Sequence, residues 1–259
     1  MKTFRVHSKV MKTGKTLLLL CSFMLLGCEE GFLSQDTEIA MGLKSALEEG
    51  SKYALKTLGK ENGFFLEQAV KIGLPEDAAK FITFVASTPV IGDVLKKTVK
   101  ELEGELVLAI NRAAEVSITE VIPIVGKSIT EMTIQDAKTI LFDDNQYAAT
   151  DYLRGKTYDP LCIACGSVIE GALNKKIVGN ASAQDVWEKF ALAHNKVYEI
   201  VSNIPGIHLE PLNTDLSLYT TQKALDGVFK KVGDEELKIR TDVSARVNDL
   251  LRKVFGMLD

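Results

Sequence analysis

The amino-acid sequence predicts an all-α protein, with a single multi-helix domain of about eight helices over residues 36–259. Three observations lead to this prediction. Apolar residues recur at three- or four-residue intervals through most of this range, which is the spacing of one helix face. Residues that favour helix starts and ends stand at the edges of these periodic segments. No linker rich in Gly, Pro or Ser divides the range, so a second domain is not expected.

The first predicted helix covers "DTEIAMGLKSALEEGSKYALKTLG". Asp36 is its expected N-cap, because an Asp side chain can accept a hydrogen bond from the first-turn amides. Gly59 is its expected end. The apolar face of this helix carries Ile39, Leu43, Leu47, Ala54 and Leu58.

The next segment breaks the helical period. Asn62-Gly63 is a turn signal, and Val70, Ile72 and Leu74 alternate with other residues as they would in a strand. The sequence therefore leaves open a short extended hairpin near 62–74.

Further helices follow, and residues that favour helix starts and ends mark their boundaries. Pro75 starts one that the Thr88-Pro89 step ends, and the long amphipathic segment 90–118 leads to a break or kink at Pro123. The remaining helices are expected to start at the capping box 133–136, at Asp159-Pro160, after Ser182, after Asp215 and near residue 242.

Residues 1–27 have the three parts of a secretory signal: a basic start, the apolar stretch "TLLLLCSFMLLG", and a small residue before the cut. The apolar stretch is shorter than the roughly 20 residues that span a bilayer. "LLGC" resembles the lipoprotein box, whose cysteine is acylated and becomes the first residue. We expect 1–27 to be a lipoprotein signal peptide and Cys28 to carry palmitate-like chains. Both Met1 and Met11 remain candidate start residues.

A short tether, residues 28–35, separates Cys28 from the predicted domain. Eight residues reach at most about 28 Å when extended, so the domain is expected close to the membrane. Glu29 follows the cysteine, where Asp would resemble an inner-membrane retention signal. By that resemblance we expect an outer-membrane lipoprotein of a Gram-negative bacterium that faces the periplasm.

The charge of the chain argues against a nucleic-acid partner. The full sequence has 31 basic and 35 acidic residues, and five of the basic residues lie within 1–27, where there is no acidic residue. Removal of that segment leaves 26 basic residues and a net charge of about −9. Nucleic-acid binding depends on neutralising phosphates with Lys and Arg, which this charge disfavours.

The motifs that could bind a cofactor or a metal are incomplete in this sequence. "VIPIVGKS" ends like a phosphate-binding loop, but Val121 stands where that loop needs glycine. "FDDNQYAATDYLR" invites a calcium loop, but Ala148 and Arg154 replace the required glycine and acid. Neither GxSxG nor HExxH occurs, so we expect no cofactor, no metal and no enzymatic activity.

Cys162 and Cys165 in "CIAC" follow the predicted helix start at Pro160. A helix N-terminus would lower the thiol pKa values. Three alternatives stay open for this pair: reduced core thiols, a structural disulfide in an oxidising envelope, or a redox centre. A redox centre would need a strand-then-helix context, whereas the flanking pattern is helical.

A carboxylate at Glu236 falls on the apolar seam of the helix after Asp215, and a carboxylate that faces a helical core must be paired. Its partner is Arg240, four residues on, or Arg112. Two interpretations stay open: a structural ion pair or solvated edge, and a ligand-binding or catalytic polar cluster. That cluster would contain Arg112, Glu115, Glu235, Glu236 and Arg240.

Several stretches resemble, in order and spacing, the bacterial envelope proteins of the domain of unknown function 4197 family. They are "EIAMGLKSALEEG", "VKIGLPE", "INRAAE", "ITEMTIQDAKTIL", "AATDYLRGKT", "YTTQKALDGVFKKVGDEELKIR" and "DLLRKVFG". The resemblance spans about 36–256 and implies one helical domain behind a secretion or lipoprotein signal. It implies no activity and no catalytic residues. The chain departs from the family pattern at "CIAC", which argues against a family-wide thiol chemistry.

We therefore expect a lipid-anchored cell-envelope protein with a non-enzymatic binding or structural role. The membrane is its expected partner through the N-terminal anchor, and the sequence names no envelope partner. One alternative is a helical pocket for a small apolar or acidic ligand, lined by Phe64, Phe65 and the loop 203–214. The other is an enzyme in which Arg112 and Glu236 meet in a cleft and the carboxylate pKa is raised.

Overall fold

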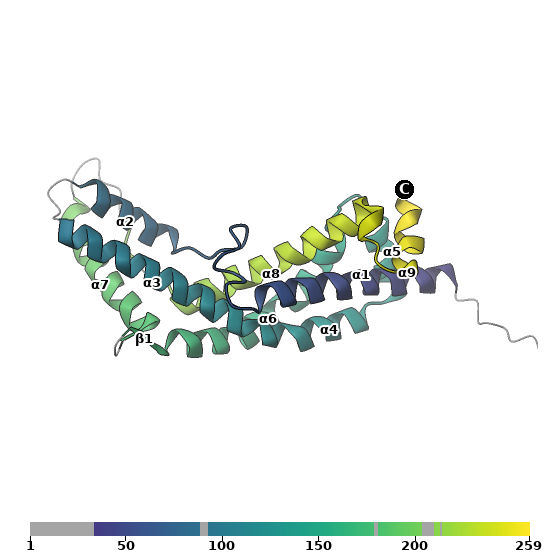
Figure 1. Cartoon of the computed structure of the whole chain (residues 1–259), viewed down its shortest axis with the longest axis horizontal. Coiled ribbons are helices and arrows are strands. Elements are labelled where there is room, and N and C mark those ends of the chain that lie inside the picture. The colour runs from purple at the N-terminus through teal and green to yellow at the C-terminus, as the bar shows by residue number, and fades with distance from the viewer. Residues whose placement is uncertain (1–33, 89–92, 179–180, 204–209, 213) are drawn as a thin grey trace, which may run out of the picture. The chain divides into compact units, whose positions relative to one another are not determined.

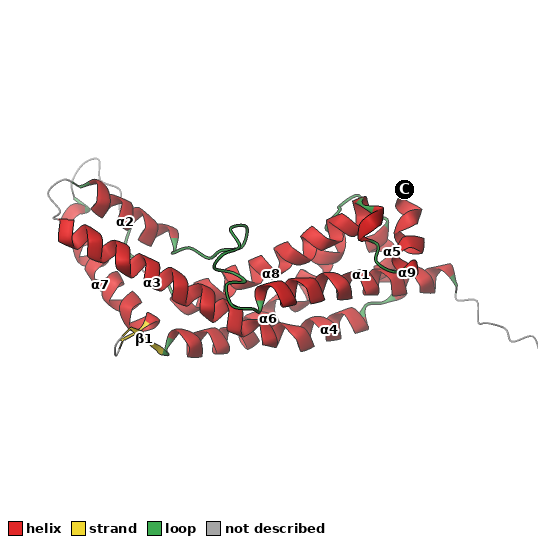
Figure 2. Ribbon diagram, in the orientation of Figure 1, coloured by secondary structure: helices red, strands yellow, loops and turns green. Residues whose placement is uncertain are grey.

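The computed structural model describes residues 34–88, 93–178, 181–203, 210–212 and 214–259 (Figure 1). The predicted signal peptide and Cys28 lie outside these residues. The described part is predominantly helical, as predicted, with one small pair of strands (Figure 2). Its helices are α1 (Gln35–Leu58), α2 (Glu76–Ser87), α3 (Asp93–Ser117), α4 (Val121–Glu131), α5 (Ile134–Leu141), α6 (Ala148–Leu173), α7 (Ala183–Val201), α8 (Leu216–Thr241) and α9 (Asp249–Phe255).

In the described part of the chain, three short 3₁₀ helices complete the helical elements, at Ile118–Glu120, Val243–Ala245 and Gly256–Leu258. The first of them is the break that Pro123 predicted between α3 and α4. The strands β1 (Lys176–Val178) and β2 (Ala181–Ser182) pair antiparallel, with Lys176 opposite Ser182. No described helix has the length and apolar content needed to cross a membrane.

The start of α1 differs from the prediction by two residues. Ser34, rather than Asp36, is the N-cap, and its side chain accepts a hydrogen bond from the backbone amide of Thr37. Asp36 instead lies in the first turn and forms an ion pair with Lys138 of α5, with 2.9 Å between Oδ1 and Nζ. An acid in the first turn is also favourable because the helix dipole is positive there.

Helix α8 packs against α1 and α6, and α9 packs against α1 (Figure 1). Gly42 permits the close approach of α1 and α9, because a Cβ at Gly42 would lie 2.5 Å from the side chain of Val254. All five apolar residues predicted for the face of α1 are buried in the core. A second group of contacts joins α2, α3 and α7.

Of the short extended stretch or hairpin that the sequence left open near 62–74, the hairpin is not formed. This segment forms turns and an irregular stretch, and no strand is assigned within it. The extended part pairs instead with a helix side chain: the amide group of Asn111 on α3 accepts from the backbone N–H of Ile72 at 2.9 Å and donates to its carbonyl at 2.7 Å. A buried side-chain amide thus makes the two hydrogen bonds that a partner strand would make.

The predicted helix start at Asp159-Pro160 is also wrong. Pro160 lies inside α6, which begins twelve residues earlier at Ala148. A proline inside a helix leaves the carbonyl of the residue four positions earlier, here Lys156, without its helical donor. Helix α6 nevertheless continues through Pro160, and it packs against α3, α4 and α8.

The other predicted caps are confirmed. Thr133 and Ser182 each form a complete capping box with the aspartate three residues later, and Asp215 accepts a hydrogen bond from the amide of Leu218. "GKS" at 126–128 lies within α4, as the helical interpretation expected. The final helix is shorter than predicted, since residues 242–248 contain a 3₁₀ turn and α9 begins only at Asp249.

Candidate functional site

Glu236 and Arg240 form a buried ion pair one turn apart on α8, with 2.9 Å between Glu236 Oε1 and Arg240 Nε. The Glu236 carboxylate also accepts hydrogen bonds from the backbone amides of Ala149 and Thr150, at the start of α6, and from the Thr150 hydroxyl. The Arg240 guanidinium donates to two backbone carbonyls, those of Ile140 and Leu141, at the end of α5. The pair therefore binds both ends of the connection between α5 and α6.

Glu115 and Arg112 form a second pair one turn apart on α3, with 2.6 Å between the charged atoms. The buried Glu115 carboxylate accepts from the backbone amides of Phe64 and Phe65, at 3.1 and 3.4 Å. Arg112 donates to the side chains of Glu61 and Asn62 in the same loop. This pair holds the chain just after α1, where Asn62 adopts a positive φ of 67°.

The predicted polar cluster is therefore not one site. Within the described residues, no hydrogen bond or ion pair joins the Glu115 pair to the Glu236 pair. Glu235 belongs to neither, since it forms an ion pair with Lys238, whose ammonium lies 5.3 Å from the ring centroid of Tyr53. Both buried carboxylates accept hydrogen bonds from backbone amides, and each also forms an ion pair with an arginine. Their geometry is that of structural caps.

The two thiols of "CIAC" are free in this structure, which corresponds to the first of the three alternatives. Both residues lie in the middle of α6, where no helix N-terminus can lower their pKa values. Cys165 is fully buried and its Sγ donates to the carbonyl of Ser117 at 3.7 Å. Burial raises the pKa of Cys165 to about 11. Burial, together with the charge of Asp159, also raises the pKa of the half-buried Cys162. These pKa values fit inert core thiols.

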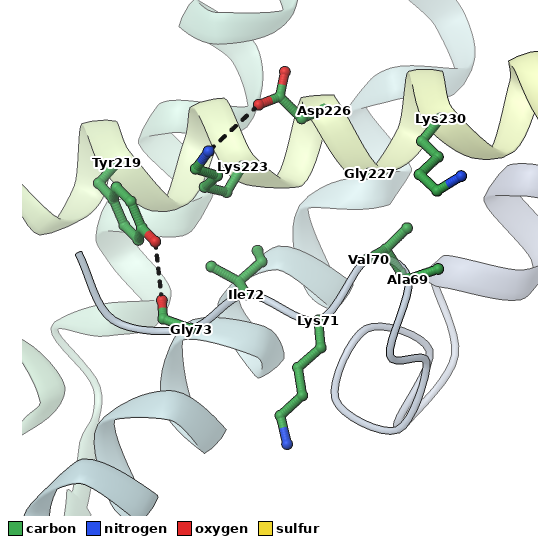
Figure 3. Close-up of a pocket in the computed structure, with 10 residues that line it drawn as sticks. All are labelled: Ala69, Val70, Lys71, Ile72, Gly73, Tyr219, Lys223, Asp226, Gly227 and Lys230. Atoms are coloured by element: carbon green, nitrogen blue, oxygen red, sulfur yellow. Dashed lines mark hydrogen bonds and ion pairs between the residues drawn. The ribbon is translucent and has the colours of Figure 1, made fainter. Parts of the chain in front are cut away.

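A groove runs between the segment 69–73 and α8, with a volume of about 300 Å³ (Figure 3). The Tyr219 hydroxyl donates to the carbonyl of Gly73 at 3.1 Å across it. Lys223 pairs with Asp226 at 3.9 Å, and Lys71 extends away from α8 toward the ring of Phe65. Each lysine of this groove already interacts with an acidic or aromatic side chain. We therefore interpret the groove as a contact between the segment 69–73 and α8 rather than as a ligand site.

Phe64, one of the residues expected to line a ligand pocket, is part of the hydrophobic core. Its side chain is fully buried in the core against α8, where a Cβ on Gly227 would lie 2.7 Å from its ring. Of the loop 203–214, residues 204–209 and 213 lie outside the described part. Leu212 is buried, and its backbone N–H and carbonyl both bond to the side chain of Asn195 on α7.

An apolar cavity of about 460 Å³ lies elsewhere, between α2, α3 and α7. This volume is within the range of about 300–1,000 Å³ that is usual for small-ligand pockets. We call it the α2–α3–α7 cavity. It is lined by Phe81, Phe84, Val85, Thr98, Val99, Leu102, Glu105, Ala181, Val186, Lys189, Phe190, Ala193 and Val197.

A buried histidine stands beside this cavity. The ring of His194 packs edge-on against Phe81, with 4.8 Å between centroids. Its Nδ1 lies 3.0 Å from the Asn195 side-chain oxygen, which already accepts from Leu212, so Nδ1 carries the proton. Nε2 is buried and has no hydrogen-bond partner among the described residues. The Nε2 atom is thus a hydrogen-bond acceptor with no donor beside it in the described part of the chain, on a ring that packs against Phe81.

Sequence reasoning missed the α2–α3–α7 cavity, although the signal for it was present. Helix α7 carries apolar residues at 186, 190, 193 and 197, which continue one stripe, and α2 carries two phenylalanines and a valine at helical spacing. Such stripes predict burial, but only the packing of the helices determines whether they meet without a gap. Among the described residues, no group of three or more His, Cys, Asp or Glu is placed to hold a metal ion.

Comparison with known proteins adds one finding. The family described as "Protein of unknown function (DUF4197)" matches residues 33–256, nearly the whole described part of the chain. No curated protein and no solved structure matches the chain.

Proposed function

Because the chain belongs to the DUF4197 family, whose description assigns no function, we propose one from the site itself. The protein is a lipid-anchored binding protein of the cell envelope that holds a small apolar ligand in the α2–α3–α7 cavity. The single observation that carries this proposal is the cavity, which three helices line mainly with aromatic and aliphatic side chains. Transfer of apolar surface from water into such a cavity is favourable, by about 25 cal/mol for each Å² buried.

The anchor is the second part of the proposal. Cys28 ends an apolar signal of the right length and carries the acyl chains that hold the protein at the outer membrane, facing the periplasm. Two or three chains make such an anchor effectively permanent, because each buried methylene adds about 0.8 kcal/mol. The described domain begins at Ser34, six residues after Cys28, so the short tether keeps the start of α1 close to the lipid surface.

The arrangement of charged side chains favours a binding role over an enzyme that uses Arg112 and Glu236. A catalytic carboxylate needs an oxygen that can reach substrate. The carboxylate oxygens of Glu236 and Glu115 instead accept hydrogen bonds from backbone amides, and the two carboxylates bind different segments of the chain.

Two measurements test the proposal. Cells given a palmitate analogue should label the wild type, and Cys28→Ala should remove the label; persistent labelling would disprove the anchor. For the cavity, binding of the uncharged fluorophore N-phenyl-1-naphthylamine should be lost in Ala193→Trp, because an indole at this exposed lining position obstructs the cavity. Leu192→Trp is the matched control, since Leu192 is 64% exposed and does not line the cavity. Equal binding by both variants would exclude the cavity as the binding site.

A further inference from the structure

The lining of the α2–α3–α7 cavity divides into an apolar interior and a charged rim. Phe81, Val85, Val99 and Phe190 are buried and supply the interior. The exposed members of the lining mark the rim, and they are Thr98, Glu105, Lys189 and Ala193. One acid from α3 and one base from α7 thus stand at the edge of an apolar cavity.

These two charges form no ion pair in the described part of the chain, whereas two lysine–glutamate pairs form nearby on α3. On α3, Lys97 pairs with Glu101 and Lys100 with Glu103. Glu105 and Lys189 have no ion pair in the described part of the chain, either with each other or with another residue. Both charges are therefore available to a ligand that occupies the cavity.

We propose that the ligand is a single-chain amphiphile with a zwitterionic headgroup, the chemical class of a lysophospholipid with a phosphate and an amine. This inference rests on the proposed function of the cavity. The acyl chain occupies the apolar interior between Phe81 and Phe190. At the rim, Lys189 binds the phosphate and Glu105 binds the ammonium group. An anionic or a cationic headgroup would satisfy one rim residue and be repelled by the other.

The apolar interior supplies most of the affinity, and the rim supplies selectivity. Exposed ion pairs are weak because water and salt screen them. We therefore expect each rim contact to change the dissociation constant by only about two- to fivefold. The effect should shrink at high ionic strength.

The test compares four probes of equal chain length in displacing N-phenyl-1-naphthylamine from the folded protein. They are lauroyl lysophosphatidylethanolamine, laurate, dodecylamine and dodecanol, each used below its micelle-forming concentration. The wild type should bind the lysophospholipid most tightly. Lys189→Gln and Glu105→Gln should each weaken that binding about two- to fivefold and leave dodecanol unchanged. Lys100→Gln is the matched control, because Lys100 is exposed on α3 and does not line the cavity.

The reversed double variant, Glu105→Lys with Lys189→Glu, separates a headgroup contact from a general loss of structure. It keeps the net charge and should restore part of the lysophospholipid affinity, since a zwitterion can bind in the opposite sense. Equal affinity for all four probes, unchanged by the rim variants, would overturn the headgroup assignment while the cavity proposal stands. Binding of no probe, in wild type and Ala193→Trp alike, would overturn both.

Discussion

Glu236 shows how single residues are used in this protein. Its carboxylate accepts hydrogen bonds from two backbone amides, one hydroxyl and one guanidinium. Glu115 is used similarly on α3, where it binds two successive amides and an arginine. In both cases the carboxylate and the arginine lie one turn apart on a helix and hold a loop from another part of the chain. A buried charge is tolerated because every such group has several partners.

The adjacent residues Glu235 and Glu236 allow a matched test of this role. Glu236→Ala should lower the free energy of unfolding by about 3–5 kcal/mol, because it leaves the buried Arg240 without its counter-charge and two backbone amides without their acceptor. Glu235→Ala removes a partly exposed pair with Lys238, in which the lysine is exposed and the glutamate is partly buried, and should cost only about 1 kcal/mol. Urea titration of both variants measures the difference. Equal losses would contradict the structural role of Glu236.

Cys165 predicts how stability depends on alkaline pH. Burial raises the pKa of this thiol from 9.0 to about 11, so the folded state favours the neutral form. Its contribution is fully present below pH 9 and is lost as pH rises from about 9 to 11. Thermal unfolding between pH 8 and 11 should show a steeper loss for wild type than for Cys165→Ala. Parallel curves for the two proteins would refute the assignment.

At the scale of elements, α6 is the helix that local signals described least well. Pro160 interrupts the backbone hydrogen bonds and the preceding aspartate looks like an N-cap, so local chemistry predicts a start there. The helix instead begins at Ala148, where Glu236 of α8 binds the first free amides. A residue distant in sequence thus supplies the cap.

Pro160→Ala should stabilise the protein. The substitution restores a hydrogen bond to the carbonyl of Lys156, and its gain of about 3 kcal/mol exceeds the added freedom of the unfolded chain, which costs about 0.4–1 kcal/mol. Pro75→Ala is the control and should lower stability slightly, because Pro75 precedes the first residue of α2 and breaks no helical bond there. Melting curves recorded by circular dichroism show whether each substitution raises or lowers the melting temperature. A lower melting temperature for Pro160→Ala would count against the continuous helix.

At the scale of the whole molecule, long-range contacts hold the C-terminal segment to the rest of the domain. Arg246 is 2% exposed and donates to the carbonyls of Ile239 and Arg240 at the end of α8. Its guanidinium also makes two hydrogen bonds of 2.7 Å to Asp259. Lys253 of α9 pairs with Glu38 of α1. The end of the chain thereby closes against its first helix and against α8.

Asp259 predicts sensitivity to acid. The hydrogen bond from Arg246 holds the pKa of Asp259 below its ordinary value of 3.8. A lowered carboxylate pKa contributes stability above pH 3.8, and this contribution is lost as pH falls further through the folded-state pKa. Asp259→Asn should therefore be less stable than wild type at pH 7, and the difference should narrow as the pH falls below 3.8. Melting temperatures across this range measure the convergence. A constant difference at every pH would rule out the ionic contact.

The all-α class, most helix boundaries and three of the predicted N-caps follow from the sequence alone, because apolar periodicity and side-chain capping are local properties. The pairing of Arg240 with Glu236 also follows from it, since residues four apart on a helix share a face. The other features depend on contacts between segments that are far apart in the sequence. Asn111 pairs with Ile72 where the sequence left a hairpin open, Glu236 caps α6 from another helix, and α2, α3 and α7 leave an apolar cavity between them. Each depends on residues brought together by helix packing, which no local pattern encodes.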